Sequence, residues 1–132
     1  MNKKITNTQA FNLAEKLNNP DILGIKDTEF ALAVYKNLKT IIEHYEKLQK
    51  LITPSKEWEE LTKDVKTEEE HLKLKEQKGN EKIFSIREKQ IAKYNEALIS
   101  NYPKSLIKVK IKNLNTKLSA IDITNLESML IL

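Results

Sequence analysis

Apolar residues recur at every third or fourth position between Asp27 and Ile52, and this spacing predicts one long helix with a buried face. Asp27 is a suitable N-cap, and Pro54 ends the helix because proline has no backbone N–H to donate. We therefore expect a central helix of about 25 residues. The residues of this apolar stripe are Phe30, Val34, Leu38, Ile41, Tyr45, Leu48 and Ile52.

From Leu38 onward the stripe keeps a strict heptad spacing, which favours packing along another helix at a shallow angle. Two arrangements fit this pattern. One is a homodimeric coiled coil, and the other is packing on helices of the same chain around Trp58–Leu74 and Glu81–Ile99. We expect the second arrangement. The stripe is widened by other apolar residues, so more than one neighbour is expected to pack on it: Ala31, Leu32, Tyr35, Ile42 and Leu51.

Other helices are predicted on both sides of the central one. Thr6 and Gln9 have the spacing of a capping box and open a short amphipathic helix that ends near Asn19. A charged helix with a thin apolar edge is expected from about residue 54 to 77, and a third long helix from Glu81 to Ser100.

These elements predict a mainly α fold with a minor β component (α+β), in which three long or short antiparallel helices surround the central helix. Residues 1–132 are expected to form a single helical domain. Within it, residues 54–80 are expected to be a charged, partly mobile helix and turn, because apolar anchors are sparse there.

One stretch, residues 106–112, has the alternating pattern of a half-buried strand. In it Ile107, Val109 and Ile111 alternate with Lys108, Lys110 and Lys112. A strand needs a partner, and we expect a small two-stranded element formed with the N-terminal segment Lys3–Thr6 or with a second copy of the chain.

The end of the chain is strongly apolar. Thr124 and Glu127 have capping-box spacing and predict a short C-terminal helix that finishes in Met129, Leu130, Ile131 and Leu132. An end of this kind is expected to dock on the core or on a partner.

The charge of the chain is only mildly basic, with 23 Lys and Arg against 19 Asp and Glu and a formal net charge of +4. Arg87 is the only arginine, although proteins that read nucleic acids depend on arginine for bidentate contacts. The first residues lack the apolar run of a signal peptide, and no run approaches the about 20 apolar residues that span a bilayer. We expect a soluble, cytoplasmic protein without a membrane partner.

The residues needed for common catalytic and metal sites are missing from the sequence. It contains no Cys, which excludes disulfides and thiolate zinc sites, and only two glycines, which excludes a P-loop or a dinucleotide fingerprint. His44 and His71 are far apart in the sequence, and we expect both to be surface residues. We expect no enzyme activity, no cofactor and no bound metal.

Three groups of residues are candidates for binding. The first is the lysine ladder, Lys108, Lys110 and Lys112, in a basic stretch from Lys104 to Lys117 that would contact nucleic acid or an acidic protein. The simpler interpretation, which we favour, is the solvated face of a small sheet. The others are an acidic stretch suited to a basic groove, and the apolar C-terminus. Their residues are Glu57, Glu60 and Glu68, and Leu130 and Leu132.

Several short motifs also follow one another in a recognisable order. They are Ile-Thr-Asn-Thr-Gln-x-x-Asn-Leu at 5–13, Lys-Asn-Leu at 36–38, Lys-Leu-Gln-Lys-Leu-Ile at 47–52, Val-Lys-Ile-Lys-x-Leu at 109–114 and Leu-x-x-Met-Leu at 126–130. In this order they resemble a family of small uncharacterised proteins, a domain of unknown function, encoded in bacteriophages and prophages of low-GC bacteria. The charged stretch Trp58–Lys82 is longer and more acidic than the family pattern. The resemblance implies a phage origin, but it supplies no mechanism, since the family has no established catalytic residues and no known cofactor.

A small helical phage protein without a reaction centre is expected to act by protein–protein binding. We expect a virion or tail assembly or accessory component, located in the host cytoplasm or in the virion. The alternatives are an inhibitor of a host defence system that binds a nuclease complex, as anti-CRISPR proteins do, and a weak nucleic-acid-binding protein. A phage structural protein or a host defence complex would be the partner, and self-association is also possible.

Overall fold

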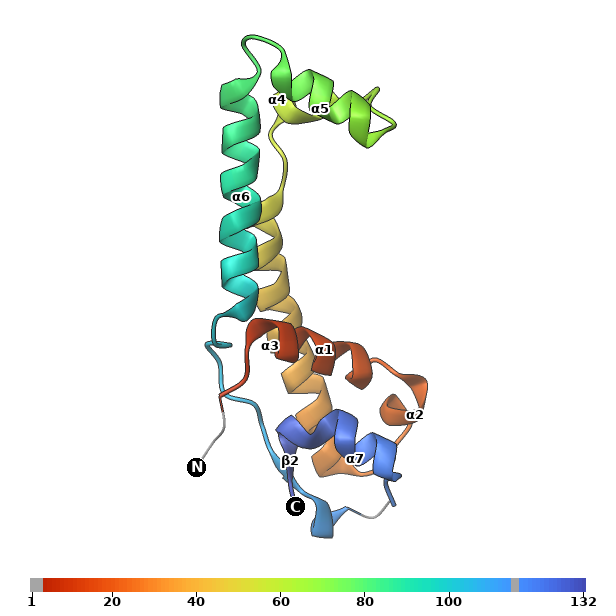
Figure 1. Ribbon diagram of the computed structural model, residues 1–132. Coiled ribbons are helices and arrows are strands. Elements are labelled where there is room, and N and C mark those ends of the chain that lie inside the picture. Colours follow the sequence, from red (N-terminus) through yellow and green to blue (C-terminus); the bar gives the residue numbers. More distant parts are fainter. Residues whose placement is uncertain (1–3, 115–116) are drawn as a thin grey trace. The chain divides into compact units, whose positions relative to one another are not determined.

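The computed structural model of the chain describes residues 4–114 and 117–132, and in these residues the protein is mainly helical (Figure 1). The helices are α1 (Asn7–Leu17), α2 (Pro20–Leu23), α3 (Thr28–Ile52), α4 (Lys56–Thr62), α5 (Glu68–Glu76), α6 (Glu81–Ile99) and α7 (Ala120–Leu126). Two short strands, β1 (Val109–Lys110) and β2 (Leu130–Ile131), and two 3-10 turns, η1 (Ile111–Asn113) and η2 (Glu127–Met129), complete the described elements.

The chain divides into two compact units. The first combines Met1–Lys47 with Leu98–Leu132, and the second is Leu48–Ala97. Helices α3 and α6 contribute residues to both units. The expectation of a single domain over residues 1–132 stays a prediction.

The central helix is confirmed as α3, which is 25 residues long. The buried carboxylate of Asp27 accepts a hydrogen bond from the Phe30 N–H at 3.0 Å, which satisfies one of the free donors of the first turn. Pro54 follows the last turn, as expected. One side of α3 is buried, at Phe30, Ala33, Val34, Asn37, Ile41 and Leu48.

Helices α1 and α7 pack with the first part of α3 to form the core of the first unit (Figure 1). The capping box that opens α1 is confirmed, because the Gln9 N–H donates to the Thr6 hydroxyl and the Thr6 N–H donates to the Gln9 side chain. The largest fully buried side chains are Phe30, Leu17, Ile41, Leu126, Met129 and Val109.

A buried amide joins α3 to the segment that leads into β1. Asn37, with 3% of its surface exposed, donates from Nδ2 to the Ile107 carbonyl at 2.9 Å. Its Oδ1 accepts from the Ile107 N–H at 2.8 Å. The side chain of Asn37 therefore pairs with the backbone of Ile107 as a neighbouring strand would.

The expected pairing of the strand is wrong. Strand β1 pairs in parallel with β2 at the end of the chain, in the register Val109 with Leu130 and Lys110 with Ile131. The backbone groups of Ile107 are already bonded to Asn37, so they take no part in a longer ladder. The chain then turns at η1, where the Leu114 N–H donates to the Ile111 carbonyl.

The N-terminal segment lies beside the other end of this loop. Thr6 forms a single antiparallel bridge with Asn101, and the Tyr102 N–H donates to the Ile5 carbonyl at 2.8 Å. Lys3, which belonged to the expected strand partner, lies outside the described residues.

The expected helix over residues 54–77 is two helices, α4 and α5. Thr67 caps α5 by accepting from the Glu70 N–H, and the Glu70 carboxylate accepts from the Lys66 N–H. These side-chain bonds start a new helix at a point where the apolar spacing alone suggested continuation.

The capping box near the C-terminus is also displaced from its expected position. Ser119 and Asp122 form the box that opens α7. Thr124 lies within α7, where its hydroxyl donates to the Ala120 carbonyl. After α7 the chain continues as η2 and β2.

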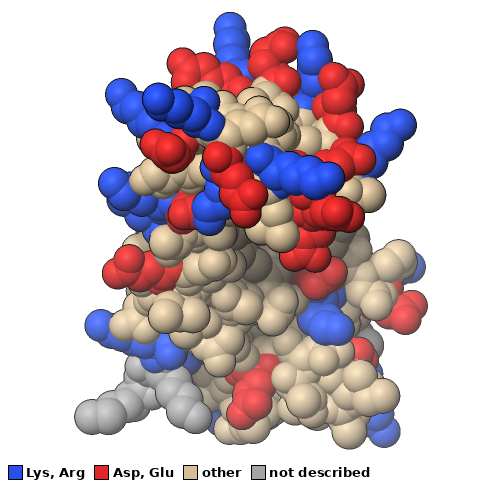
Figure 2. All heavy atoms as spheres, turned by 45° about the horizontal axis from the view of Figure 1, so that its top comes forward, with Lys and Arg blue, Asp and Glu red and all other residues tan. Residues whose placement is uncertain are grey.

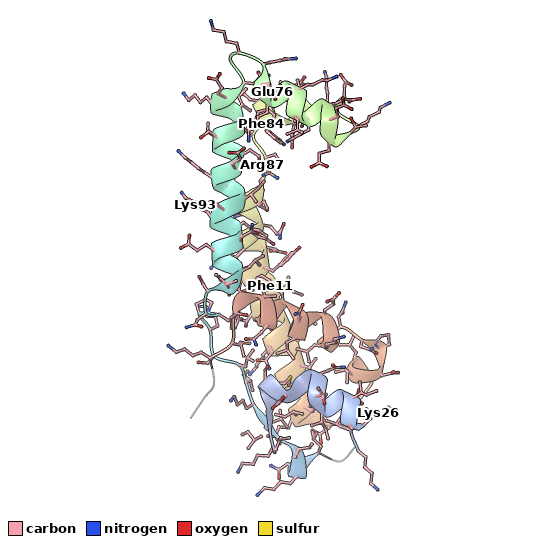
Figure 3. All side chains as sticks on the ribbon, in the orientation of Figure 1. Phe11, Lys26, Glu76, Phe84, Arg87 and Lys93 are labelled. Carbon is pink, nitrogen blue, oxygen red and sulfur yellow. The ribbon has the colours of Figure 1, made fainter. Side chains whose placement is uncertain are left out.

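In the second unit, the last turn of α3 packs against α6. Gln49 donates to the Tyr94 hydroxyl at 2.9 Å, and Arg87 donates to the Ile52 carbonyl at 2.6 Å. This part of the expected packing within the chain is confirmed. Phe84 and Arg87, labelled on α6 in Figure 3, also contact Trp58, the former edge to face at 4.9 Å between ring centroids.

We expect Asn37→Leu to lower the free energy of unfolding by about 2–4 kcal/mol, because both backbone groups of Ile107 lose their partner. Urea unfolding followed by circular dichroism measures this effect. Asn95→Leu, on an exposed position of α6, is the matched control. An Asn37→Leu protein within about 0.5 kcal/mol of the wild type would contradict the role assigned to Asn37.

Candidate binding surfaces

The lysines of the ladder do not share one strand face. Lys110 is in β1 and Lys112 is in η1, and both are exposed. Lys108 precedes β1, is half-buried, and lines a pocket of about 310 Å³ together with Lys4 and Lys104. We call this cavity the basic pocket. Its other lining residues are Ile5, Asn101, Tyr102, Pro103, Ser105, Leu106 and Ser128.

Beside the basic pocket lies a small polar and aromatic cluster. Tyr102 packs edge to face on His44, with 5.4 Å between ring centroids, and His44 Nε2 lies 2.9 Å from Asn7 Oδ1. The Tyr102 hydroxyl is buried and has no hydrogen-bond partner in the part of the chain that the structure describes. Burial, with the nearby charge of Glu43, raises the pKa of Tyr102.

Neither histidine is simply a surface residue. His44 and His71 are both half-buried, and His71 packs edge to face against both Trp58 and Phe84. Burial, followed by the positive charges of Lys47 and Lys104, lowers the pKa of His44. Within the described parts of the chain, no cluster of His, Asp and Glu is arranged to hold a metal ion.

A second surface is an apolar groove of about 420 Å³ between α1 and α3. Phe11, labelled on α1 in Figure 3, packs edge to face on Tyr45 at 5.2 Å and forms part of its wall. Glu15 is the only charged side chain among the lining residues. The others are Asn12, Ala14, Asn18, Leu38, Ile41 and Ile42.

The groove is continuous with a second heptad stripe on α3. The residues of this exposed seam, spaced alternately by four and three positions, are Ala31, Tyr35, Leu38, Ile42 and Tyr45. Tyr35, Ile42 and Tyr45 keep 62%, 43% and 44% of their surface exposed, and Leu38 is half-buried. The seam therefore has the spacing of a coiled-coil face, and α1 contacts it at one end, where Phe11 packs on Tyr45.

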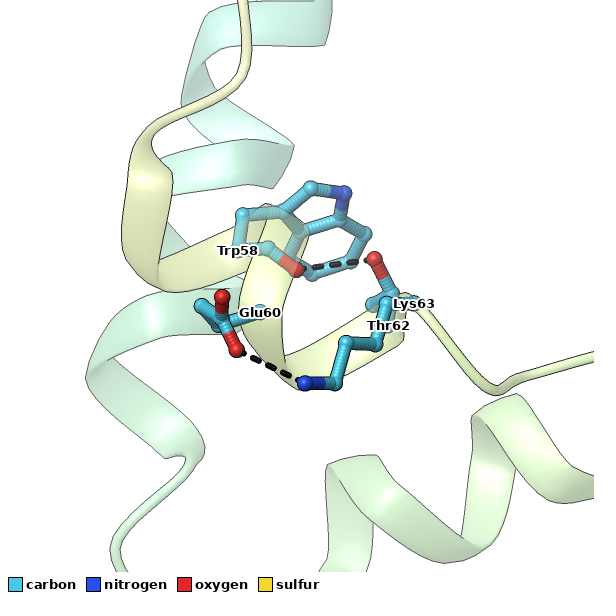
Figure 4. Close-up of polar contacts among 4 residues, drawn as sticks. All are labelled: Trp58, Glu60, Thr62 and Lys63. Carbon is cyan, nitrogen blue, oxygen red and sulfur yellow. Dashed lines mark hydrogen bonds and ion pairs between the residues drawn. The ribbon is translucent and has the colours of Figure 1, made fainter.

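The acidic candidates lie in the second unit, on two different helices. Glu57 and Glu60 are in α4 and Glu68 is in α5, all exposed. Glu60 forms an exposed ion pair with Lys63 at 3.1 Å (Figure 4). Figure 2 shows basic (Lys and Arg) and acidic (Asp and Glu) side chains mixed over the face that carries these helices, so the acids form no single negative surface there.

The apolar C-terminus is only partly docked. Leu130 is buried in the core through β2, whereas Leu132 is 76% exposed. The end of the chain is held by pairing of β2 with β1 and by burial of Met129 and Leu130.

The sequence contained a signal for two features that the initial interpretation missed. Asn37 occupies a position of the buried face between Val34 and Ile41, where a polar side chain needs a specific partner. The heptad spacing of the apolar residues in the exposed seam begins at Ala31 in the sequence. The contribution of Lys4 to the basic pocket has no local signal, because its neighbours there come from the other end of the chain.

Comparison of the chain with protein-family models, with curated proteins and with solved structures gives no match. In residues 4–114 and 117–132, each helix is either too short or too polar to cross a membrane.

We expect the folded protein to lose stability as the pH falls below the ordinary histidine value of 6.5, because the pKa of His44 is lowered. Below this pH the unfolded state binds a proton at His44 more readily than the folded state does. The contribution of His44 to the free energy of unfolding is therefore complete above pH 6.5 and decreases below it. The direct measurement is the titration of the His44 ring by NMR. Its midpoint should lie below 6.5 and should rise in Lys104→Met. A midpoint at or above 6.5 would contradict the assignment.

Proposed function

We propose that this protein is a non-enzymatic, phage-encoded binding protein whose exposed seam on α3 receives an amphipathic helix of another protein. We further propose that this partner is a virion or tail component and that the complex serves assembly. The observation that carries the proposal is the heptad spacing of exposed apolar residues from Ala31 to Tyr45. The phage origin rests on the resemblance of the sequence motifs.

The seam favours a helix as the occupant. Alternate spacings of four and three residues keep an apolar stripe facing a partner helix over several turns. The α1–α3 groove at the end of the seam would accept a large apolar side chain of that helix, since Phe11, Ile42 and Tyr45 line it.

The charges beside the seam constrain the partner. Lys39 and Glu46 directly follow Leu38 and Tyr45, are exposed, and so lie at the free edge of the seam. Glu15 stands at the groove. The complementary helix would carry an acidic residue opposite Lys39 and basic residues toward Glu46 and Glu15.

The alternative, an inhibitor of a host nuclease complex, depends on the acids of α4 and α5. Their mixture with lysines weakens attraction to a basic groove (Figure 2). For this reason we place assembly first.

Site-specific photo-crosslinking in phage-infected cells tests the proposal. A crosslinker in place of Tyr35 or Ile42 should capture one phage structural protein through a helix with heptad spacing, and one in place of Leu72 should not. Leu72 is a suitable control because it is an exposed apolar residue of the second unit.

A synthetic peptide of the captured helix then gives the affinity. Ile42→Glu should weaken its binding about tenfold or more, whereas Leu72→Glu should leave it unchanged. Circular dichroism of each variant checks the fold. Equal capture from position 72, capture of a host nuclease, or a crosslinked pair of identical chains would each overturn the proposal.

A further inference from the structure

The basic pocket differs from the seam in both shape and chemistry. It lies in the first unit and is walled by three separate parts of the chain: Lys4–Ile5, the loop from Asn101 to Lys108, and Ser128. Its volume of about 310 Å³ is at the lower end of the range for small-ligand sites. The basic pocket shares no lining residue with the α1–α3 groove.

All the charged side chains that line the basic pocket are positive. Lys4, Lys104 and Lys108 line it, and none of its ten lining residues is acidic. None of these lysines takes part in an ion pair recorded among the described residues. Ammonium groups around a concave surface reinforce each other's potential and attract an anion.

Neutral donors accompany these charges. Ser105 and Ser128 contribute hydroxyl groups and Asn101 contributes an amide, with Asn101 and Ser105 in the loop and Ser128 in η2. A phosphate group carries several acceptor oxygens and up to two charges, so it matches this set of donors better than a singly charged carboxylate does.

The walls are fixed by backbone contacts close to each lysine. Ile5, next to Lys4, accepts from the Tyr102 N–H, and Tyr102 is two residues before Lys104. Ile107, next to Lys108, is held by Asn37 through two hydrogen bonds. The backbone of the site is therefore ordered before any ligand binds, which lowers the entropic cost of binding.

We propose that the basic pocket binds a phosphate group, either as free phosphate or as part of a small phosphorylated molecule. A nucleic acid strand is less well matched, because Lys110 and Lys112 lie outside the pocket and, among the described residues, no track of exposed aromatic residues continues from it. A compact cavity with all its lysines around one volume suits a single phosphate.

Titration of the ¹⁵N-labelled full chain at constant ionic strength tests this proposal. Inorganic phosphate should give saturable shifts at the amides of Asn101, Ser105 and Ser128. Glycerol 3-phosphate and adenosine monophosphate are titrated in the same way. Tighter binding of either monoester than of inorganic phosphate would identify an organic phosphate as the ligand, and equal binding would identify free phosphate.

Matched variants separate a specific site from general attraction. Lys104→Gln with Lys108→Gln should weaken phosphate binding about tenfold or more. The control pair, Lys110→Gln with Lys112→Gln, removes the same charge outside the pocket and should have an effect below about twofold. Equal effects of both pairs would overturn the proposal, as would the absence of saturable shifts with every probe.

Two further readouts do not depend on the variants. In the wild type, phosphate should raise the midpoint of the His44 titration, because the bound anion offsets the charge of Lys104. A single-stranded oligonucleotide that binds more tightly than the monoesters, through Lys110 and Lys112, would show that the lysines serve nucleic acid instead.

Discussion

Within the first unit, Asn37 joins α3 to the segment around Ile107 that leads into β1. Its amide replaces a strand partner for Ile107, with the Asn37 side chain buried and both bonds partly buried. The residues before Ile107, together with Lys108 after it, line the basic pocket, and the next two residues form β1. Since β1 pairs with β2, the position of the C-terminal residues also follows from this contact. A buried amide is costly unless both of its polar ends are bonded, so the arrangement has little freedom to shift.

Helix α3 has two apolar faces, of which one is buried and the other is largely exposed. The face through Phe30, Val34 and Ile41 is buried and forms the core, with Asn37 as its single polar member. The face through Tyr35, Ile42 and Tyr45 is left largely exposed. A protein of this size has a limited core, and a second full stripe on the same helix is more apolar surface than its own fold buries. This excess is the physical basis of the proposal that the seam binds a helix.

Much of the fold could be predicted from periodicity and capping. The bounds of α3 followed from Asp27, the stripe and Pro54, and α1 followed from Thr6 and Gln9. The errors arose where a side chain redirected the backbone: Thr67 starts a new helix, and Asn37 occupies the groups that an extended strand would need. The sites were less predictable, because Lys108 joins Lys4 and Lys104 through tertiary structure and leaves Lys110 and Lys112 elsewhere. Leu130 was correctly expected to dock, but Leu132 remains exposed.

Hydrogen exchange at the amide of Ile107 tests the central claim most directly. If its N–H donates to the buried Asn37 side chain, it should exchange at the rate set by opening of the first unit, as slowly as amides in the middle of α3. It would do so although Ile107 itself is a partly exposed residue outside any regular strand. Exchange as fast as in an unstructured peptide would mean that Asn37 does not hold this segment, and the account of the pocket and of the β1–β2 pairing would then be wrong.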